Sequence, residues 1–129
     1  MTRVALITGA AGGIGGAAAD RFLAGGWRVA AVDINAVDTA DRPADMVLPI
    51  TADLRQVADC RRAVTEAVDW GQRLDAVVNA AGVWTEGPSE HTSEYEWDAV
   101  IDLNLKGLYF VCSASIAHLE PTHGCIINM

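Results

Sequence analysis

The sequence predicts an α/β protein built on a doubly wound parallel sheet, incomplete, of about five strands with helices on both faces. Two observations support this fold class. Short apolar runs of β type alternate with longer segments of helical spacing, and a cluster of glycines follows the first apolar run directly. Such alternation is typical of βαβ units, whose right-handed crossovers place helices on the faces of a parallel sheet. Because the chain contains no internal repeat and no linker-like stretch, we expect a single domain over residues 1–129.

In the first half of the chain, apolar runs and glycines mark the elements. Val4–Thr8 is a compact run of β-forming residues and is expected to be a buried strand. A helix is expected over Gly13–Ala24, where apolar residues recur on one face and a glycine pair follows the last turn. Residues 28–32 are the second apolar run and therefore the second expected strand. The stretch 35–45 carries Asp, Thr and Pro43, so we expect a loop there.

The second half repeats the alternation. Residues 46–50 are a third short apolar run, and the apolar positions of residues 55–70 return at helical spacing. A fourth strand is expected at residues 74–78. A long helix is expected over residues 93–119, and a fifth strand begins at Cys125.

Composition and charge narrow the classes of function. The formal net charge is −8 and Lys106 is the only lysine, which argues against a nucleic-acid partner because phosphate binding needs clustered basic residues. The three cysteines form no Cys-x-x-Cys pair and the three histidines lie at no ligand spacing with them, so no metal site is expected. No signal-peptide pattern and no run of about 20 apolar residues is found, so we expect a cytoplasmic protein without a membrane partner.

The glycine-rich turn after the first strand carries the strongest functional signal. It reads Thr8-Gly9-Ala10-Ala11-Gly12-Gly13-Ile14-Gly15, between an expected strand and an expected helix. A chain that turns sharply here lets its backbone approach a diphosphate and presents free N–H groups at a helix N-terminus. We therefore expect Gly9, Gly13, Ile14 and Gly15 to bind a cofactor. A tight turn with a purely structural role is the alternative, and the strand–turn–helix placement disfavours it.

A carboxylate at the end of the second strand predicts which dinucleotide is bound. Asp33 lies near the offset of about 20 residues at which an acid meets the ribose hydroxyls of NAD. It would repel the 2′-phosphate of NADP, and no Arg or Lys lies in the glycine turn or directly after Asp33. We therefore expect NAD, with NADP less favoured. The alternative is a strand-end Asp that only faces water.

The spacing Thr-Gly-x-x-x-Gly-x-Gly, from Thr8 to Gly15, resembles that of the short-chain dehydrogenase/reductase family. Three later segments are similar to motifs of that family: Ala52-Asp53-Leu54, Asn79-Ala80-Ala81-Gly82 with Ala80 in place of a second Asn, and Asp102–Gly107 in the long helix. The resemblance covers residues 2–129. It implies a Rossmann-like dinucleotide-binding domain and an NAD-dependent oxidoreductase that transfers a hydride between nicotinamide and a carbonyl or alcohol of a small-molecule substrate.

The resemblance also implies roles for single residues. It places further cofactor contacts at the ends of the third and fourth strands, by Asp53, Leu54, Asn79, Ala80 and Gly82. It makes Asn104 a catalytic residue, which helps to hold a water of a proton relay.

These motifs keep structural alternatives. Asp53 with Gln56 fits a capping box for the helix that follows. Asn79 fits an amide link between the fourth strand and a neighbouring strand. Asn104 lies inside an expected helix, where asparagine is disfavoured, and this favours a specific polar task.

By the same resemblance, the family's acid–base chemistry needs a tyrosine followed four residues later by a lysine. Neither Tyr95 nor Tyr109 is followed by a lysine at that spacing, and Lys106 follows Asp102 instead. A tyrosine with a pKa of about 10 and no lysine beside it is a poor acid or base at neutral pH. We therefore expect the N-terminal half of such an enzyme, truncated after the fifth strand and without turnover of its own.

Two other functions fit parts of the pattern. A non-catalytic nucleotide-binding module would keep the glycine turn and lack the tyrosine–lysine pair. A nucleotide-sugar epimerase-like relative shares the fold, but typically has two residues between its first two fingerprint glycines, whereas three separate Gly9 from Gly13. The helix at residues 93–119 is apolar on opposite sides, so we expect a homo-oligomer to form through it in a full-length form.

Overall fold

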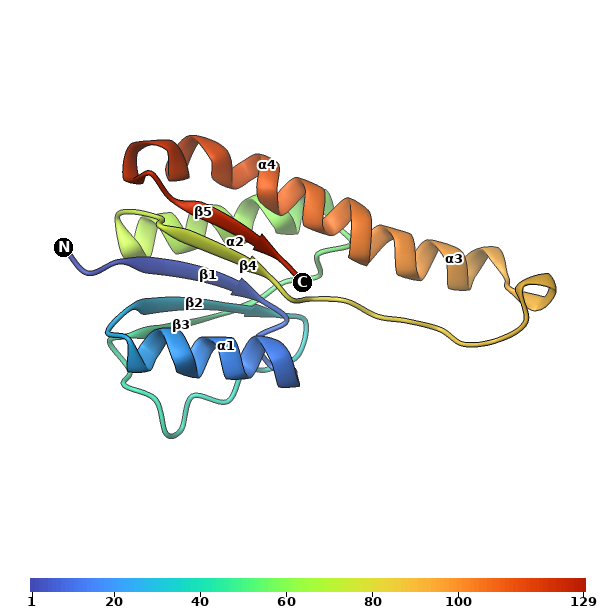
Figure 1. Ribbon diagram of the computed structural model, residues 1–129, viewed down its shortest axis with the longest axis horizontal. Coiled ribbons are helices and arrows are strands. Elements are labelled where there is room, and N and C mark those ends of the chain that lie inside the picture. The colour runs from blue at the N-terminus through green and yellow to red at the C-terminus, as the bar shows by residue number, and fades with distance from the viewer.

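The computed structural model describes all of residues 1–129 and contains one five-stranded sheet. Its strands are β1 Val4–Thr8, β2 Arg28–Asp33, β3 Val47–Thr51, β4 Ala76–Asn79 and β5 Cys125–Asn128. They lie in the order β3-β2-β1-β4-β5, and every neighbouring pair is parallel (Figure 1). The chain runs outward from β1 to β3 and then returns to the other side of β1. The expected doubly wound α/β fold is confirmed, with element ends that differ from the expected ranges by at most two residues.

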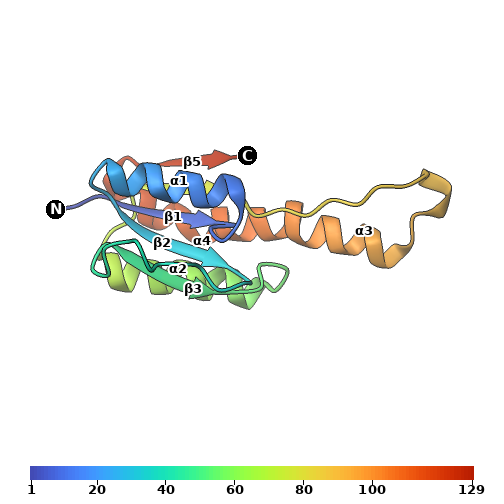
Figure 2. The same cartoon turned by 90° about the horizontal axis from the view of Figure 1, so that it is seen from below.

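Helices cover both faces of the sheet. α1, Gly13–Ala24, packs on one face, whereas α2, Val57–Gly71, and α4, Leu108–Leu119, pack against each other on the opposite face (Figures 1 and 2). The expected loop between β2 and β3 contains no helix. The arrangement leaves the carboxyl edge of the sheet open for a ligand.

Two apolar layers hold the sheet between its helices. Towards α1 the sheet presents three buried alanines, Ala5, Ala31 and Ala76, among Val and Ile side chains. Towards α2 and α4 it presents larger ones, such as Leu6 and Val77. Side chains alternate between the two faces along a strand. Because both faces are covered, all five residues of β1 are buried and the strand reads as an unbroken apolar run.

α3, Glu94–Ile101, and α4 form one continuous helical rod, as the sequence predicts, but a π-helical turn, η2, Asp102–Gly107, joins them. At Gly107 the rod touches the backbone of Leu54, since a Cβ at this position would lie 2.5 Å from the Leu54 carbonyl oxygen. π turns inside helices frequently mark functional sites. The sequence period of 3.6 residues gave no sign of this insertion.

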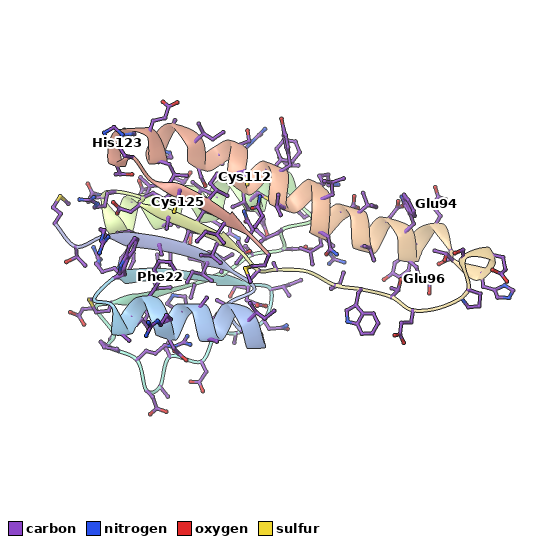
Figure 3. All side chains as sticks on the ribbon, in the orientation of Figure 1. Phe22, Glu94, Glu96, Cys112, His123 and Cys125 are labelled. Carbon is purple, nitrogen blue, oxygen red and sulfur yellow. The ribbon has the colours of Figure 1, made fainter.

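The N-terminal part of the rod projects beyond the sheet. Residues 83–93 run outward from β4 through a short 3-10 turn, η1, Ser89–His91, and the chain then returns as α3. Figure 3 shows Glu94 and Glu96 near the far end of this projection, and no residue of α3 is buried. Ser93 and Glu96 form a capping box that fixes where α3 begins.

The helical rod also bears on the membrane expectation. From Glu94 to Thr122 it spans 29 residues with a mean hydropathy of 1.3 in its apolar window, so by length and composition it could cross a membrane. This corrects the expectation that no segment approaches such a length. A core helix passes the same test, but only 17% of this window is buried, and α4 packs on the domain through Val111, Ser115 and Leu119.

At the amino edge of the sheet, a buried carboxylate ties β1 to the start of β4. Asp75 accepts hydrogen bonds from the N–H of Val4 and from Nε of Arg73, both at 2.8 Å. Burial alone would raise the pKa of Asp75, but the hydrogen bonds from Arg73 and Val4 outweigh it, and the pKa lies below its ordinary value. The charged form of Asp75 therefore stabilises the fold.

Candidate functional site

Polar residues at the ends of three neighbouring strands meet at the carboxyl edge of the sheet. Thr8 of β1 pairs in register with Val32 on one side and with Asn79 on the other, and Asp33 is the last residue of β2. A cavity of about 670 Å³ opens beside them. Among the predicted site residues, its walls include Gly9, Asp33, Asp53, Leu54, Ala80 and Gly82. Ligands of open α/β sheets bind at this edge, where the strand order changes direction.

Two glycines of the turn are required by close backbone contacts. Gly9 has φ +68°, and a Cβ there would lie 2.8 Å from the carbonyl carbon and oxygen of Ala80. A Cβ at Gly15 would lie 2.1 Å from the carbonyl oxygen of Gly9. The start of α1 therefore packs directly on the turn, and the turn packs directly on the residues after β4. These two glycines therefore have a structural role, and they also leave space for a ligand.

The first turn of α1 lacks a cap. Its N-cap residue is Gly12, which has no side chain to accept a hydrogen bond, and no acidic residue lies in the first turn. The N–H groups of Gly13, Ile14 and Gly15 precede the first intrahelical bond, which Gly16 donates to Gly12. Nothing lies within 4 Å of a Cβ built on Gly13, and the Ile14 side chain is 62% exposed. Free N–H groups at a helix N-terminus, with open space at Gly13 and Ile14, suit an anionic group.

Thr8 is a site residue that the sequence analysis quoted without giving it a role. Its buried hydroxyl accepts hydrogen bonds from the N–H groups of Ala80 and Ala81, both at 3.1 Å. These bonds join the glycine turn to the turn after β4. A polar residue at the end of a buried strand is the only sequence feature that could have indicated this role. It does not identify the partners, because they lie 72 and 73 residues away in sequence.

Asp33 closes the glycine turn from the side of β2. Its Oδ2 accepts a hydrogen bond from the N–H of Ala11 at 3.0 Å, and its Oδ1 accepts one from the N–H of Asn35 at 2.9 Å. The side chain is therefore held against the turn, unlike a strand-end Asp that only faces water. Each oxygen keeps a second lone pair, so the carboxylate can still accept hydroxyl groups from a ligand in the cavity.

Arg42 reaches the same region from the loop between β2 and β3. Its guanidinium pairs with Asp20 of α1 at 2.8 Å and lies 3.4 Å from the carbonyl oxygen of Gly16. Its Nη1 is buried without a partner. Arg42 lies neither in the glycine turn nor directly after Asp33, so the sequence pattern did not indicate it. The loop brings this arginine close, but Asp20 already balances its charge.

Asp53 has a different partner from the one that the capping-box alternative proposes. Gln56 is the N-cap of α2 without a side-chain cap bond, so the capping box of Asp53 with Gln56 is wrong. The Asp53 carboxylate instead forms an ion pair with Arg55, with Nε to Oδ1 at 2.9 Å and Nη2 to Oδ2 at 2.8 Å. The side-chain hydrogen bonds from Arg55 lower the pKa of Asp53. Its neighbour Leu54 is almost fully buried in the cavity wall.

Asn79 forms the link between strands that its structural alternative proposes. Its Nδ2 donates to Oδ1 of Asn128 on β5 at 2.9 Å and approaches Sγ of Cys112 at 3.3 Å. Figure 3 shows Cys112 on α4, over the strands at this edge. Oδ1 of Asn79 is buried without a partner. The side chain therefore ties β4 to β5 beneath the cavity rather than lining the cavity itself.

Asn104 holds the loop that follows β4. In the π turn η2, its Oδ1 accepts the N–H of Val83 at 2.9 Å and its Nδ2 donates to the Val83 carbonyl at 2.7 Å. Gly82 lies beside this contact, and a Cβ there would be in ordinary van der Waals contact with Oδ1 of Asn104, at 3.4 Å. The polar task that sequence analysis expected of Asn104 thus includes a two-point bond to the backbone at the rim of the cavity.

The single lysine has an acidic partner. Nζ of Lys106 pairs with Oδ1 of Asp102 at 2.9 Å, one helical turn earlier. Tyr95 and Tyr109 are both exposed on the rod. The only lysine of the chain is thus paired with an aspartate rather than with a tyrosine.

Comparison with known proteins supports this geometry. The sequence model of the short chain dehydrogenase family matches residues 3–129. Among curated relatives, D-threitol dehydrogenase from Mycolicibacterium smegmatis is 36% identical over 136 aligned residues, covering 98% of this chain and 52% of the relative. 2-(R)-hydroxypropyl-CoM dehydrogenase from Xanthobacter autotrophicus is 37% identical, covering 100% of this chain and 56% of the relative. The chain thus spans about half the length of the curated relatives it matches.

Solved structures show the same fold. 3-ketoacyl-(acyl-carrier-protein) reductase from Brucella melitensis, in a complex with NADH, matches with a TM-score of 0.88 and 31% identity, over 98% of this chain and 56% of that one. Ligand-free aldohexose dehydrogenase from Thermoplasma acidophilum matches with a TM-score of 0.88 and 27% identity, over 98% of this chain and 48% of that one.

Proposed function

Because the chain belongs to the short-chain dehydrogenase family, we propose that it is the NAD-binding part of an oxidoreductase that transfers a hydride between nicotinamide and a carbonyl or alcohol carbon of a small molecule. The observation that carries the proposal is the uncapped first turn of α1 beside the cavity, with Asp33 held against it. The alternative epimerase-like function has no support in the family match.

The residues at the cavity fit a dinucleotide. The free N–H groups of Gly13, Ile14 and Gly15 suit a diphosphate, and the open acceptor positions of Asp33 suit ribose hydroxyls. Asp53 and Leu54 border the β3 end of the cavity, and Ala80 and Gly82 border the β4 end. When bound, the nicotinamide supplies or accepts the hydride. Asn79 acts indirectly, through the link between β4 and β5.

The charge of the site favours NAD over NADP. A 2′-phosphate on the adenosine ribose would add negative charge beside the Asp33 carboxylate, which already accepts the N–H of Ala11. Arg42 and Arg55 are the arginines beside this part of the cavity, and each is paired with an aspartate, Asp20 or Asp53. Both arginine charges are therefore already balanced by a carboxylate before a 2′-phosphate is added.

Fluorescence titration with NADH and NADPH tests the cofactor proposal. We expect NADH to bind at least about tenfold more tightly, because close like charges cost more than about 1.4 kcal/mol in a partly buried site. Asp33→Asn should reduce that preference. Asp69→Asn is the control, because it removes the same charge from a residue of α2 that lines neither this cavity nor the pocket beside it. Equal affinity of the unchanged chain for both dinucleotides would refute the role of Asp33.

Asn104 is proposed as a catalytic residue of the whole enzyme, and here its amide also positions the loop at Val83. The chain itself contains no tyrosine–lysine pair, and its lysine is bound by Asp102. We therefore propose that these 129 residues bind dinucleotide and do not turn over a substrate. A non-catalytic binding module stays a second candidate on this observation.

An exposed apolar stripe on the rod supports a homo-oligomer. Leu105, Tyr109 and Ile116 are 61%, 62% and 50% exposed and recur at helical spacing. A second copy of the chain would bury this stripe, so we propose self-association through the rod. The three free thiols fit a reducing compartment, which is the basis for proposing a cytoplasmic location.

A further inference from the structure

A buried thiol on α2 lies where that helix packs against the helical rod (Figure 1). The side chain of Cys60 is fully buried, and its Sγ lies 3.2 Å from the carbonyl oxygen of Leu54 and 3.7 Å from that of Gly107. Burial raises the pKa of the Cys60 thiol, so the thiol keeps its proton at neutral pH and can donate. One S–H group is therefore shared between two backbone carbonyls that lie far apart in sequence.

The carbonyl of Leu54 depends on this thiol. Leu54 precedes α2, and no backbone N–H donates to its carbonyl oxygen. The residue is buried, and a buried carbonyl without a hydrogen bond is costly. The same oxygen lies against Gly107, where a Cβ would approach it to 2.5 Å. Cys60 thus satisfies the carbonyl against which the rod packs most closely.

The thiol contacts the rod at the end of the π turn η2. A π turn inserts one residue into an α-helix, and one residue corresponds to a rotation of about 100° about the helix axis. The exact place of the insertion therefore decides the direction in which Asn104, inside η2, points its amide. Two groups of side-chain hydrogen bonds join η2 to the rest of the chain, those of Asn104 to Val83 and that of Cys60 to Gly107.

The two ends of η2 are not held equally. After the turn, α4 packs on the domain through buried residues, Val111 among them. Before the turn, no residue of α3 is buried. The register of η2 is therefore set from its Gly107 end, where the carbonyls of Leu54 and Gly107 meet the Cys60 thiol.

We propose that Cys60 is a positioning residue for Asn104. By holding the backbone of Gly107 next to that of Leu54, the thiol keeps η2 in the register in which the Asn104 amide bonds to both the N–H and the carbonyl of Val83. The catalytic role of Asn104 rests on the proposed function, whereas its two bonds to Val83 do not depend on it.

Two substitutions separate a hydrogen-bonding role of Cys60 from a packing role. Cys60→Ser keeps a donor, whereas Cys60→Val fills the site without one. The readout is hydrogen exchange of the Val83 amide by NMR, divided by that of Leu6, a fully buried residue of β1 whose exchange reports global opening. Cys60→Val should raise this ratio at least about threefold, as for the loss of one hydrogen bond, and Cys60→Ser should leave it within about twofold of the unchanged chain.

A double-substitution cycle tests whether Cys60 acts through Asn104. Asn104→Ala removes both side-chain bonds to Val83, so Cys60→Val should cause no further rise of the ratio when it is added to that variant. An equal rise with and without Asn104 would overturn the proposal, because a loss of packing alone would act independently of the asparagine. Should Cys60→Val not fold, Cys60→Ala, which also lacks the donor, gives the same comparison.

Ser115→Ala is the matched control. The Ser115 hydroxyl is a fully buried donor on the same rod, but it bonds to the carbonyl of Val111 at 2.7 Å, beyond η2. The control should leave the ratio unchanged. No change in Cys60→Val, or an equal rise in Cys60→Ser or Ser115→Ala, would overturn the role of Cys60. None of these measurements uses a dinucleotide, so a failure to bind NADH would overturn the proposed function and leave the positioning role of Cys60 intact.

Discussion

Gly15→Ala is expected to destabilise the folded chain, whereas Gly13→Ala, two residues earlier in the same helical turn, is not. A Cβ at position 15 would lie 2.1 Å from the carbonyl oxygen of Gly9 and 2.5 Å from its carbonyl carbon. These are backbone atoms that cannot rotate away, so the turn itself must move, and overpacking of this kind costs about 1–3 kcal/mol. A Cβ at position 13 meets nothing within 4 Å. Gly13→Ala should raise the free energy of unfolding by up to about 1 kcal/mol, because alanine has less conformational entropy to lose on folding.

Thermal unfolding of the three chains measures the difference. At about 4 °C per kcal/mol for a domain of this size, Gly15→Ala should lower Tm by about 4–12 °C, and Gly13→Ala should raise it by up to about 4 °C. NADH affinity should fall in Gly15→Ala, because a displaced turn no longer aims its N–H groups at the diphosphate. A Tm of Gly15→Ala equal to that of the unchanged chain would refute the close contact between Gly9 and the start of α1.

Three further outcomes are expected. Asp75→Asn should cost about 1–3 kcal/mol at pH 7. The folded pKa of Asp75 lies below its ordinary value, so the stabilisation by its charged form is present above about pH 4 and is lost as pH falls through the folded pKa. The free energy of unfolding, measured in urea between pH 7 and 3, should therefore depend less on pH in the variant. Identical slopes for the two chains would contradict this. Asn104→Ala should speed limited proteolysis within residues 83–93, because two bonds to Val83 are lost, and unchanged cleavage would argue against its hold on the loop. Tyr109→Glu should shift sedimentation towards the monomer, and a chain that is monomeric without the substitution would refute association through the rod.

Sequence signals that act over a few residues predicted most of the fold. The apolar run Val4–Thr8 is unbroken because both faces of β1 are covered, and two of the glycines that follow it, Gly9 and Gly15, are required by backbone contacts. The Thr-Gly-x-x-x-Gly-x-Gly spacing and Asp33 therefore located the cavity before its shape was known. Short-range physics was sufficient for these features.

The features that sequence analysis missed depend on contacts between distant segments. The Thr8 hydroxyl accepts a hydrogen bond from Ala80, 72 residues later in the sequence. Arg42 pairs with Asp20 because the loop between β2 and β3 folds back on α1, and no local sequence pattern predicts that path. The π turn η2 ends at Gly107, whose backbone contacts that of Leu54, 53 residues earlier in the sequence. The capping-box alternative for Asp53 failed because a two-point pair with an arginine two residues away competes successfully with a bond to the helix N-terminus.

Because the strand order reverses at β1, two separate stretches of the chain supply the residues that line the cavity. Everything at the β3 end comes from residues before 60, and the β4 end is built from residues after 79. The two stretches touch where Gly9 and Thr8 contact Ala80 and where Gly107 contacts Leu54. Substitutions within the loop 83–93 leave these contacts in place, so the proposed adenosine end of the cavity is expected to tolerate changes in that loop.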